Sequence, residues 1–287
     1  MTLPTMVPEL SRDEVLAWCE RVDTGPFATL AAGERIAFPN QECLVMLAAA
    51  AALTRRVRVF ASVFVLPMHD PVWLAKQIAT LDVLCGGRFV LGVGAGAREE
   101  DYRSVGASFA RRHARMATDV ATLRRIWGGE PAFPGAHPVG PRPLQAGGPQ
   151  VLVGALAPRA IARAASWADG LAGFSLGPDM HEIERGFRAA SDAWRAAGRS
   201  SAPRLVTSFW YALGPRAREQ LDAYVERYLR IFGPAAVAGA QRAAAAASPQ
   251  AVCDALRGIE AAGADEAVLV PTSAGLDQLD RLQDLLG

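Results

Sequence analysis

The stretch from residue 56 to 96, RVRVFASVFVLPMHDPVWLAKQIATLDVLCGGRFVLGVGAG, constrains the fold more than any other. Val57 to Leu66 is nearly all apolar and rich in β-branched residues, which predicts a strand buried on both faces. From Asp70 to Leu84, apolar residues recur at spacings of three and four and predict a helix, which two glycines end. Arg88 to Val93 predicts a second strand. The stretch is therefore expected to form a right-handed crossover between two parallel strands.

The same alternation of strand and helix runs through the rest of the 287 residues. Eight candidate strands, each followed by a helix, lie at residues 3–10, 27–31, 57–66, 88–93, 150–153, 169–173, 204–211 and 266–270. This pattern predicts a (β/α)₈ TIM barrel, for which about 250 residues is typical. A doubly wound open sheet is the alternative. Pro4 and Pro8 are unfavourable in the first candidate strand. We expect a single domain over residues 1–287, with a Pro- and Gly-rich surface loop at 130–149.

Composition excludes several classes of protein. The net charge of +1 gives no basic footprint, so nucleic acid is not the expected partner. The longest apolar run, Cys43 to Leu53, is too short to span a bilayer, and the N-terminus lacks the regions of a signal peptide. The four cysteines show no metal-ligand spacing and predict reduced thiols. We therefore expect a cytoplasmic protein without a metal that acts on a small molecule. The oligomeric state stays open, with a homodimer as one option.

Loops that follow the strands are where a barrel carries its chemistry. Glu34 and Glu100 lie on such loops and are expected to face the barrel mouth, with a solvated carboxylate as the alternative for each. His69 is the one histidine on a strand-end loop and the one candidate for proton transfer, although a hydrogen-bonded structural histidine is the more common case. No nucleophile with its base can be assembled from the sequence, so the catalytic residues remain unknown.

Two glycine-containing turns also follow strands. Residues 92–97, GVGAGA, match the dinucleotide fingerprint, but a charged loop follows instead of the helix that the fingerprint requires. We interpret these small residues as room for a flat ring or a phosphate tail beside the strand end, and a tight turn that needs glycine is the alternative. Gly154-Ala155-Leu156-Ala157 does open a helix promptly, which favours an anion, and a plain turn is nearly as good an explanation.

Three segments resemble the bacterial luciferase-like superfamily of flavin- or deazaflavin-dependent oxidoreductases and monooxygenases. They are GERIAFPNQECLVMLAAAAALTRRVRVFASVFVLP, LPMHDPVWLAKQIATLDVLCGGRFVLGVGAGAREEDYRSVG and PQVLVGALAPRAIARAASWADGLAGF, and together they cover most of residues 33–175. The C-terminal third is similar only in layout. The resemblance implies a (β/α)₈ barrel with the cofactor ring at its mouth. It also implies a non-proline cis peptide at Ser62-Val63, beneath one face of the ring.

The resemblance further implies a set of cofactor contacts. Ring contacts are expected at Glu34, Ser62, Val63, Val65, Ala95, Gly96 and Glu100. The phosphate tail is expected at Gly154, Ala155 and Ala157, with Gly173 and Phe174 nearby. The sequence departs from the family at Ala155, which replaces a glycine of the phosphate turn. It also departs at Arg35 and Ala97, where sugar-phosphate-oxidising relatives have histidine and glutamate, so oxidation of glucose 6-phosphate is not expected.

These similarities predict an oxidoreductase that uses coenzyme F420 and exchanges a hydride with an organic substrate. Coenzyme F420 is favoured because Glu34 fits the position of its acidic ring contact, and because arginine- and alanine-rich chains are typical of organisms that make it. One alternative is an FMN-dependent monooxygenase that uses reduced flavin and O₂. Another is a non-catalytic barrel that binds flavin or nothing. The sequence does not identify the substrate.

Overall fold

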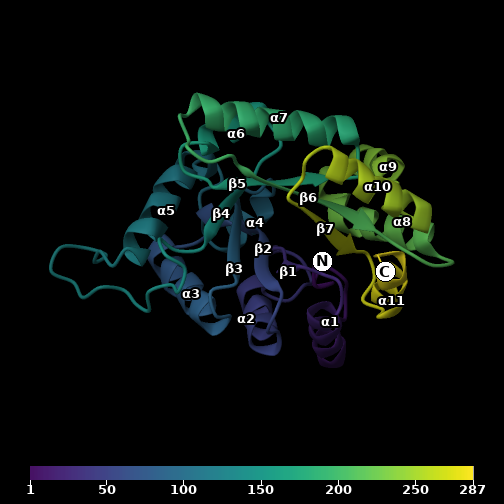
Figure 1. Ribbon diagram of the computed structural model, residues 1–287, viewed down its shortest axis with the longest axis horizontal. Coiled ribbons are helices and arrows are strands. Elements are labelled where there is room, and N and C mark those ends of the chain that lie inside the picture. Colours follow the sequence, from purple (N-terminus) through teal and green to yellow (C-terminus); the bar gives the residue numbers. More distant parts are fainter. Residues whose placement is uncertain (287) are drawn as a thin grey trace.

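Seven parallel strands form one sheet in the computed structural model, which describes residues 1–286, and their spatial order follows the chain. They are β1 (Thr29–Ala32), β2 (Arg58–Val65), β3 (Phe89–Gly94), β4 (Gln150–Gly154), β5 (Gly170–Ser175), β6 (Arg204–Tyr211) and β7 (Glu266–Pro271). The helices between them surround the sheet (Figure 1). They are α1 (Arg12–Thr24), α2 (Cys43–Leu53), α3 (Pro71–Leu84), α4 (Glu99–Ser104), α5 (Arg112–Trp127), α6 (Pro158–Ala164), α7 (Met180–Ala196), α8 (Ala217–Leu229), α9 (Pro234–Ala243), α10 (Pro249–Ala261) and α11 (Asp277–Leu286), with short 3₁₀ turns η1 (Leu66–Met68) and η2 (Arg230–Phe232). The predicted TIM barrel is confirmed.

The eighth position of the barrel is filled differently from the prediction. The strand predicted at residues 3–10 is wrong, and residues 1–3 occupy the gap between β7 and β1 instead. The Thr2 N–H donates to the Leu269 carbonyl of β7 at 2.9 Å, and the Leu3 N–H donates to Ala31 of β1 at 2.7 Å. Pro4 has no N–H to continue this ladder, which is why the strand-like pairing stops there.

The interior of the barrel is packed with one apolar residue from each strand. The cluster contains Ala31, Phe60, Val90, Leu152, Ala172, Val206 and Val268. The register pairs Ala31 with Phe60, Phe60 with Val90, and Ala172 with Val206. Leu152, Ala172 and Val268 each lie two positions beyond the residue that is paired with the preceding strand's member of the layer. A layer of this kind fills a small parallel barrel and leaves only its ends open to a ligand.

The β2–α3–β3 crossover has the predicted boundaries to within about one residue. Asp70 is the N-cap of α3, where its carboxylate accepts hydrogen bonds from the N–H groups of Val72 and Trp73. The charged loop that was expected to follow residues 92–97 is wrong in one respect, because residues 99–104 form the short helix α4. Acidic residues fill the first turn of α4, where they favour a helix N-terminus.

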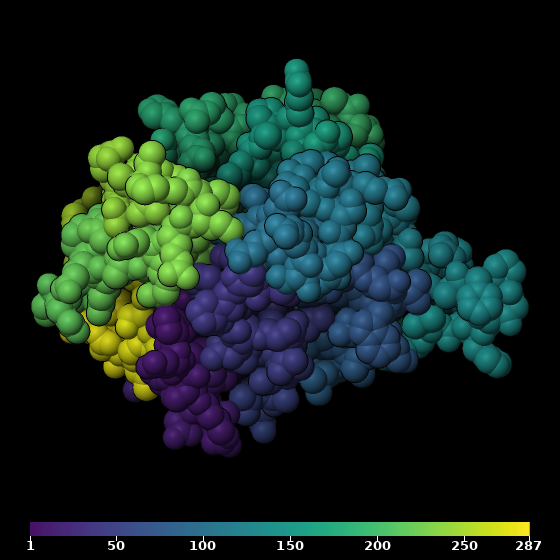
Figure 2. All heavy atoms as spheres, turned by 180° about the vertical axis from the view of Figure 1, so that it is seen from behind, coloured from purple at the N-terminus to yellow at the C-terminus, as the bar shows by residue number. Residues whose placement is uncertain are grey.

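The Pro- and Gly-rich segment predicted at 130–149 projects from the side of the barrel as a loop (Figures 1 and 2). Its return to the barrel is fixed by the buried carboxylate of Asp82 on α3. That carboxylate accepts hydrogen bonds from the N–H groups of Leu144 and Gln145 at 2.8 and 3.1 Å, and from the Gln145 side chain at 2.6 Å. In residues 1–286 the structure contains no helix long and apolar enough to cross a membrane.

Candidate functional site at the barrel mouth

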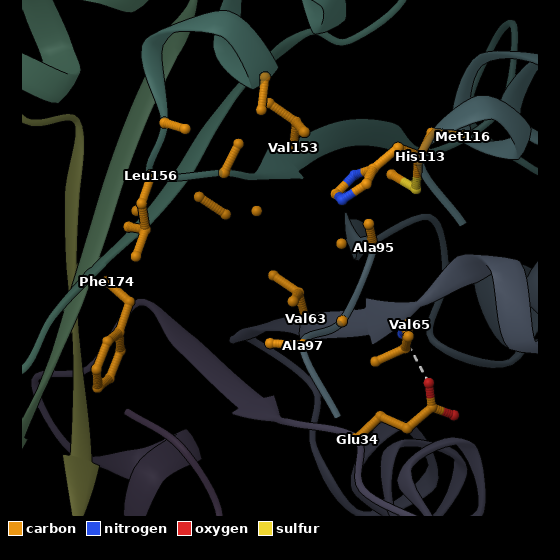
Figure 3. A pocket seen from close by; sticks show the side chains of 18 of the residues that line it. Glu34, Val63, Val65, Ala95, Ala97, His113, Met116, Val153, Leu156 and Phe174 are labelled. Carbon is orange, nitrogen blue, oxygen red and sulfur yellow. Dashed lines mark hydrogen bonds between the residues drawn. The ribbon is translucent and has the colours of Figure 1, made fainter. Parts of the chain in front are cut away.

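The carboxyl ends of the strands open into a cavity of about 770 Å³. Its wall combines strand ends, the loops that follow them, and residues of α5, α6 and α8 (Figure 3). A volume of this size is typical of pockets that enclose small ligands. The lining is mostly apolar and small, and its charged or polar side chains are few: Glu34, Ser62, Arg98, His113, Arg163, Ser208 and Tyr228.

Every predicted contact residue except Glu100 lines this cavity. The set comprises Glu34, Ser62, Val63, Val65, Ala95, Gly96, Gly154, Ala155, Ala157, Gly173 and Phe174. Glu100 lies outside the lining and is exposed. The reason is α4, which the sequence did not predict. Its winding turns the next residue, Asp101, inward and leaves Glu100 facing solvent. The structure thus assembles the predicted residues, while their contacts with a cofactor stay a prediction.

The floor of the cavity is built around the side chain of Val63. The Ser62-Val63 peptide bond is cis, as the resemblance implied, and the pairing of β2 with β3 shifts register between Ala61 and Phe64. Figure 3 shows Val63 near the centre of the site. A Cβ atom placed on Gly94 would lie 3.1 Å from Val63 Cγ2, and one placed on Gly154 would lie 3.0 Å from Val63 Cγ1.

Those distances explain why glycine occupies the ends of both β3 and β4. A valine projects into the space that their side chains would need, so only glycine fits without displacing it. Gly96 is different, because its φ of 63° lies in the left-handed region and a Cβ there would lie 2.7 Å from Val65. Residues 92–97 therefore contain a turn that needs glycine at Gly96. At Gly94 and Gly154, glycine is needed because a side chain would collide with Val63.

Glu34 holds the end of β2. One carboxylate oxygen accepts a hydrogen bond of 2.6 Å from the Val65 N–H, and the other lies 2.9 Å from His69 Nε2 (Figure 3 shows the Val65 bond). The His69 ring is stacked on Phe64 with ring centroids 4.2 Å apart. Burial raises the pKa of Glu34 above its usual value, against the opposing effect of these hydrogen bonds. His69 lies outside the cavity lining and reaches it only through Glu34.

A buried ion pair joins the loop after β1 to α4. Arg35 Nε donates to Asp101 Oδ2 at 2.9 Å, and both side chains are almost fully buried. Asp101 Oδ1 also accepts from the N–H groups of Ile36 and Ala37 at 3.2 and 2.7 Å. Sequence analysis missed this pair because its partners are 66 positions apart. It fixes the loop that carries Glu34 relative to α4.

The guanidinium of Arg163 and the imidazole of His113 lie at one end of the cavity, beside the predicted phosphate turn. His113 of α5 and Arg163 of α6 both line it. The pKa of His113 is lowered by burial and by the neighbouring charges of Arg112 and Arg163. Arg159 lies one helical turn before Arg163, so the two share a helix face. The run RRHAR at 111–115 was the signal in the sequence that could have drawn attention to this end.

The geometry so far defines a class of protein. A parallel barrel with a cavity of small residues at the carboxyl ends of its strands has the form of a barrel enzyme with its site at the mouth. In residues 1–286, no group of three or more His, Cys, Asp or Glu side chains is arranged to hold a metal ion.

Comparison with known proteins identifies the family. A family model described as luciferase-like monooxygenase matches residues 4–274, and the chain belongs to that family of oxidoreductases and monooxygenases. An uncharacterized protein of Mycobacterium tuberculosis, Rv0953c, is 32% identical over 213 residues, which cover 64% of this chain and 73% of the relative.

Solved structures of other proteins have the same fold. An F420-dependent secondary alcohol dehydrogenase in complex with an F420-acetone adduct superposes with a TM-score of 0.80 at 15% identity, covering 96% of this chain and 94% of that one. The oxygenating constituent of 3,6-diketocamphane monooxygenase from Pseudomonas putida, in complex with FMN, superposes with a TM-score of 0.76 at 17% identity, covering 99% and 94%. Both deazaflavin and flavin enzymes are therefore among the structures that this chain resembles.

Proposed function

We propose that this protein is an oxidoreductase that binds coenzyme F420 in the barrel-mouth cavity and exchanges a hydride with a small organic substrate. The observation that carries the proposal is the cavity itself, where an apolar floor around Val63 adjoins an end formed by His113 and Arg163. A planar redox cofactor with an anionic tail needs both features. When bound, the deazaflavin would supply the hydride chemistry.

The floor and walls fit a flat ring. Val63, Ala95 and Gly96 present small or branched apolar surface, which excludes water from the space above the floor. Glu34 keeps this surface in place by holding the end of β2 through the Val65 N–H. The role that we propose for Glu34 is thus to position the floor, with its stem alongside the ring.

The cationic end supports coenzyme F420 over FMN. FMN ends in a phosphate, whereas the tail of F420 continues past its phosphate into further carboxylates. Arg163 lines the cavity, and Arg159, on the same face of α6, is exposed outside it. Positive charge therefore continues beyond the point where a phosphate would lie, which suits the longer anion.

An FMN-dependent monooxygenase is the second candidate. It is favoured by the likeness to the FMN-bound monooxygenase structure, whose fold matches over 99% of this chain. The two candidates differ in their use of oxygen, because reduced FMN reacts with O₂ and a reduced deazaflavin reacts with it poorly.

Titration of the purified protein with each cofactor, followed by cofactor fluorescence, tests the proposal. We expect micromolar binding of F420, weaker binding of FMN, and no oxygen consumption above the autoxidation rate that reduced FMN shows without the protein. Tighter binding of FMN together with protein-dependent oxygen consumption would replace the first candidate by the second. If neither cofactor binds at concentrations of tens of micromolar, both candidate functions are refuted.

A negative charge added at the phosphate turn tests where the phosphate tail of the cofactor binds. Gly154→Asp would place a carboxylate beside the cofactor's phosphate and is expected to abolish binding. Gly154→Asn is the matched control, because it adds a side chain of the same size against Val63 without the negative charge. Equal cofactor affinity in the two variants would mean that the tail lies elsewhere.

A further inference from the structure

The cavity lining contains a second cation, Arg98, which makes no direct ion pair within residues 1–286. Arg98 follows the β3 turn and lines the cavity. Within residues 1–286 no carboxylate lies within ion-pairing distance of its guanidinium, since the neighbouring Asp101 is engaged by Arg35 and two backbone N–H groups. A phosphate tail bound beside Arg163 would not neutralise the charge of Arg98.

Aromatic residues hold the Arg98 side chain in place. Its guanidinium lies 4.6 Å from the ring centre of Tyr228 and 5.1 Å from that of Phe232. It makes one hydrogen bond, from Nη2 to the Tyr228 carbonyl at 3.3 Å, and its buried Nε has no partner. Burial lowers the pKa of Arg98, yet a guanidinium stays protonated in proteins. The protein thus keeps a partly desolvated positive charge at the cavity wall.

The wall around Arg98 is aromatic. Tyr228 and Phe174 both line the cavity, and Trp210 packs edge-on against each of them at 5.6 and 5.0 Å between ring centres. Figure 3 shows Phe174 and His113 on opposite sides of the cavity. Tyr228 connects Arg98 to this aromatic group, so the guanidinium and the Phe174 ring border the same aromatic part of the cavity.

We infer that Arg98 recognises the carboxylate of an organic acid substrate whose planar apolar body lies against Phe174 and Tyr228. A planar guanidinium matches a carboxylate in geometry, and the pair is strongest where water is excluded. An unpaired, partly buried cation costs stability, and an arriving anion recovers that cost. The inference rests on the proposed function, because it names the substrate class for the same cavity.

Binding of cinnamate and of its neutral isostere cinnamamide, measured by calorimetry on the full chain, tests the inference. We expect the wild type to bind cinnamate at least about tenfold more tightly than cinnamamide. Arg98→Met should remove that preference and Arg98→Lys should keep part of it. Arg103→Met is the matched control, because Arg103 is an exposed arginine on α4, and it should leave the preference unchanged.

Two results would overturn the inference. The first is equal binding of the two probes by the wild type, a comparison that needs no variant to fold. The second is an Arg98→Met protein that keeps the preference for cinnamate, and a simultaneous loss of cofactor affinity would make Arg98 a contact of the cofactor ring. Cofactor titration of Arg98→Met is expected to stay within about twofold of the wild type. A preference for cinnamate in a protein that binds neither F420 nor FMN would refute the proposed function and leave the assignment of Arg98 standing.

Discussion

The contact between Val63 and Gly154 should appear as a strong energetic coupling. A Cβ atom on Gly154 would lie 3.0, 3.1 and 3.4 Å from the Cγ1, Cγ2 and Cβ atoms of Val63. Gly154→Ala alone forces the valine to move, and overpacking of this kind costs about 1–2 kcal/mol. Val63→Ala alone removes two methyl groups from a partly buried side chain and costs about 1 kcal/mol.

The double variant separates packing from other causes. Without the two Cγ atoms, the nearest distance to the new methyl becomes the 3.4 Å to the Val63 Cβ, which is close to ordinary van der Waals contact. The added methyl also fills part of the vacated space. The double variant should therefore be no less stable than Val63→Ala, with a coupling of about 1–2 kcal/mol.

Urea denaturation followed by tryptophan fluorescence measures the four free energies of unfolding. Gly154→Ala combined with Val252→Ala is the control, because Val252 lies on α10 in a different part of the core, and that pair should be additive. Additivity of Val63→Ala and Gly154→Ala to within about 0.5 kcal/mol would show that the valine does not explain the glycine.

Two further predictions concern buried carboxylates. Because burial raises the pKa of Glu34, the stability that its protonated form contributes is present below the usual glutamate value of 4.5 and is lost as pH rises through the raised pKa. Glu34→Gln cannot ionise, so its stability relative to the wild type should increase between pH 4.5 and 8, and parallel pH profiles of the two unfolding midpoints would contradict this. Asp82→Ala removes the acceptor of three hydrogen bonds to the projecting loop, and should lower the free energy of unfolding by about 2–3 kcal/mol and speed proteolysis within residues 130–149. The exposed Asp13→Ala is its control, and an equal effect of the two substitutions would count against the anchoring role of Asp82.

Local patterns in the sequence were sufficient for much of the fold. Apolar periodicity and terminal proline and glycine placed β2, α3 and β3 to within about one residue, because each signal acts within its own element. The helix α4 was missed because EEDYRS has no apolar periodicity, and its only inward side chains, Asp101 and Tyr102, are stabilised by distant or loop partners. Residues 1–3 were missed because their pairing with β1 and β7 is entirely long-range.

The candidate site was predictable only in part, for a related reason. Barrel topology alone brings strand ends together, so residues such as Gly154 and Gly173 could be assigned to the mouth from their positions in the chain. The positions of Arg98, His113 and Arg163 at the cavity could not be predicted in this way. Arg98 depends on Tyr228, 130 positions away, and His113 faces Arg163 across two helices. No local pattern in the sequence indicates such contacts. The hydrogen bond from the Val65 N–H to Glu34 is likewise visible only in the structure.

A crystal structure of the protein grown with saturating coenzyme F420 tests the central claim most directly. The account predicts the deazaflavin ring over Val63 at the carboxyl ends of the strands, with its phosphate beside His113 and Arg163. A cofactor bound at any other surface, or a barrel mouth free of cofactor at saturation, would contradict it.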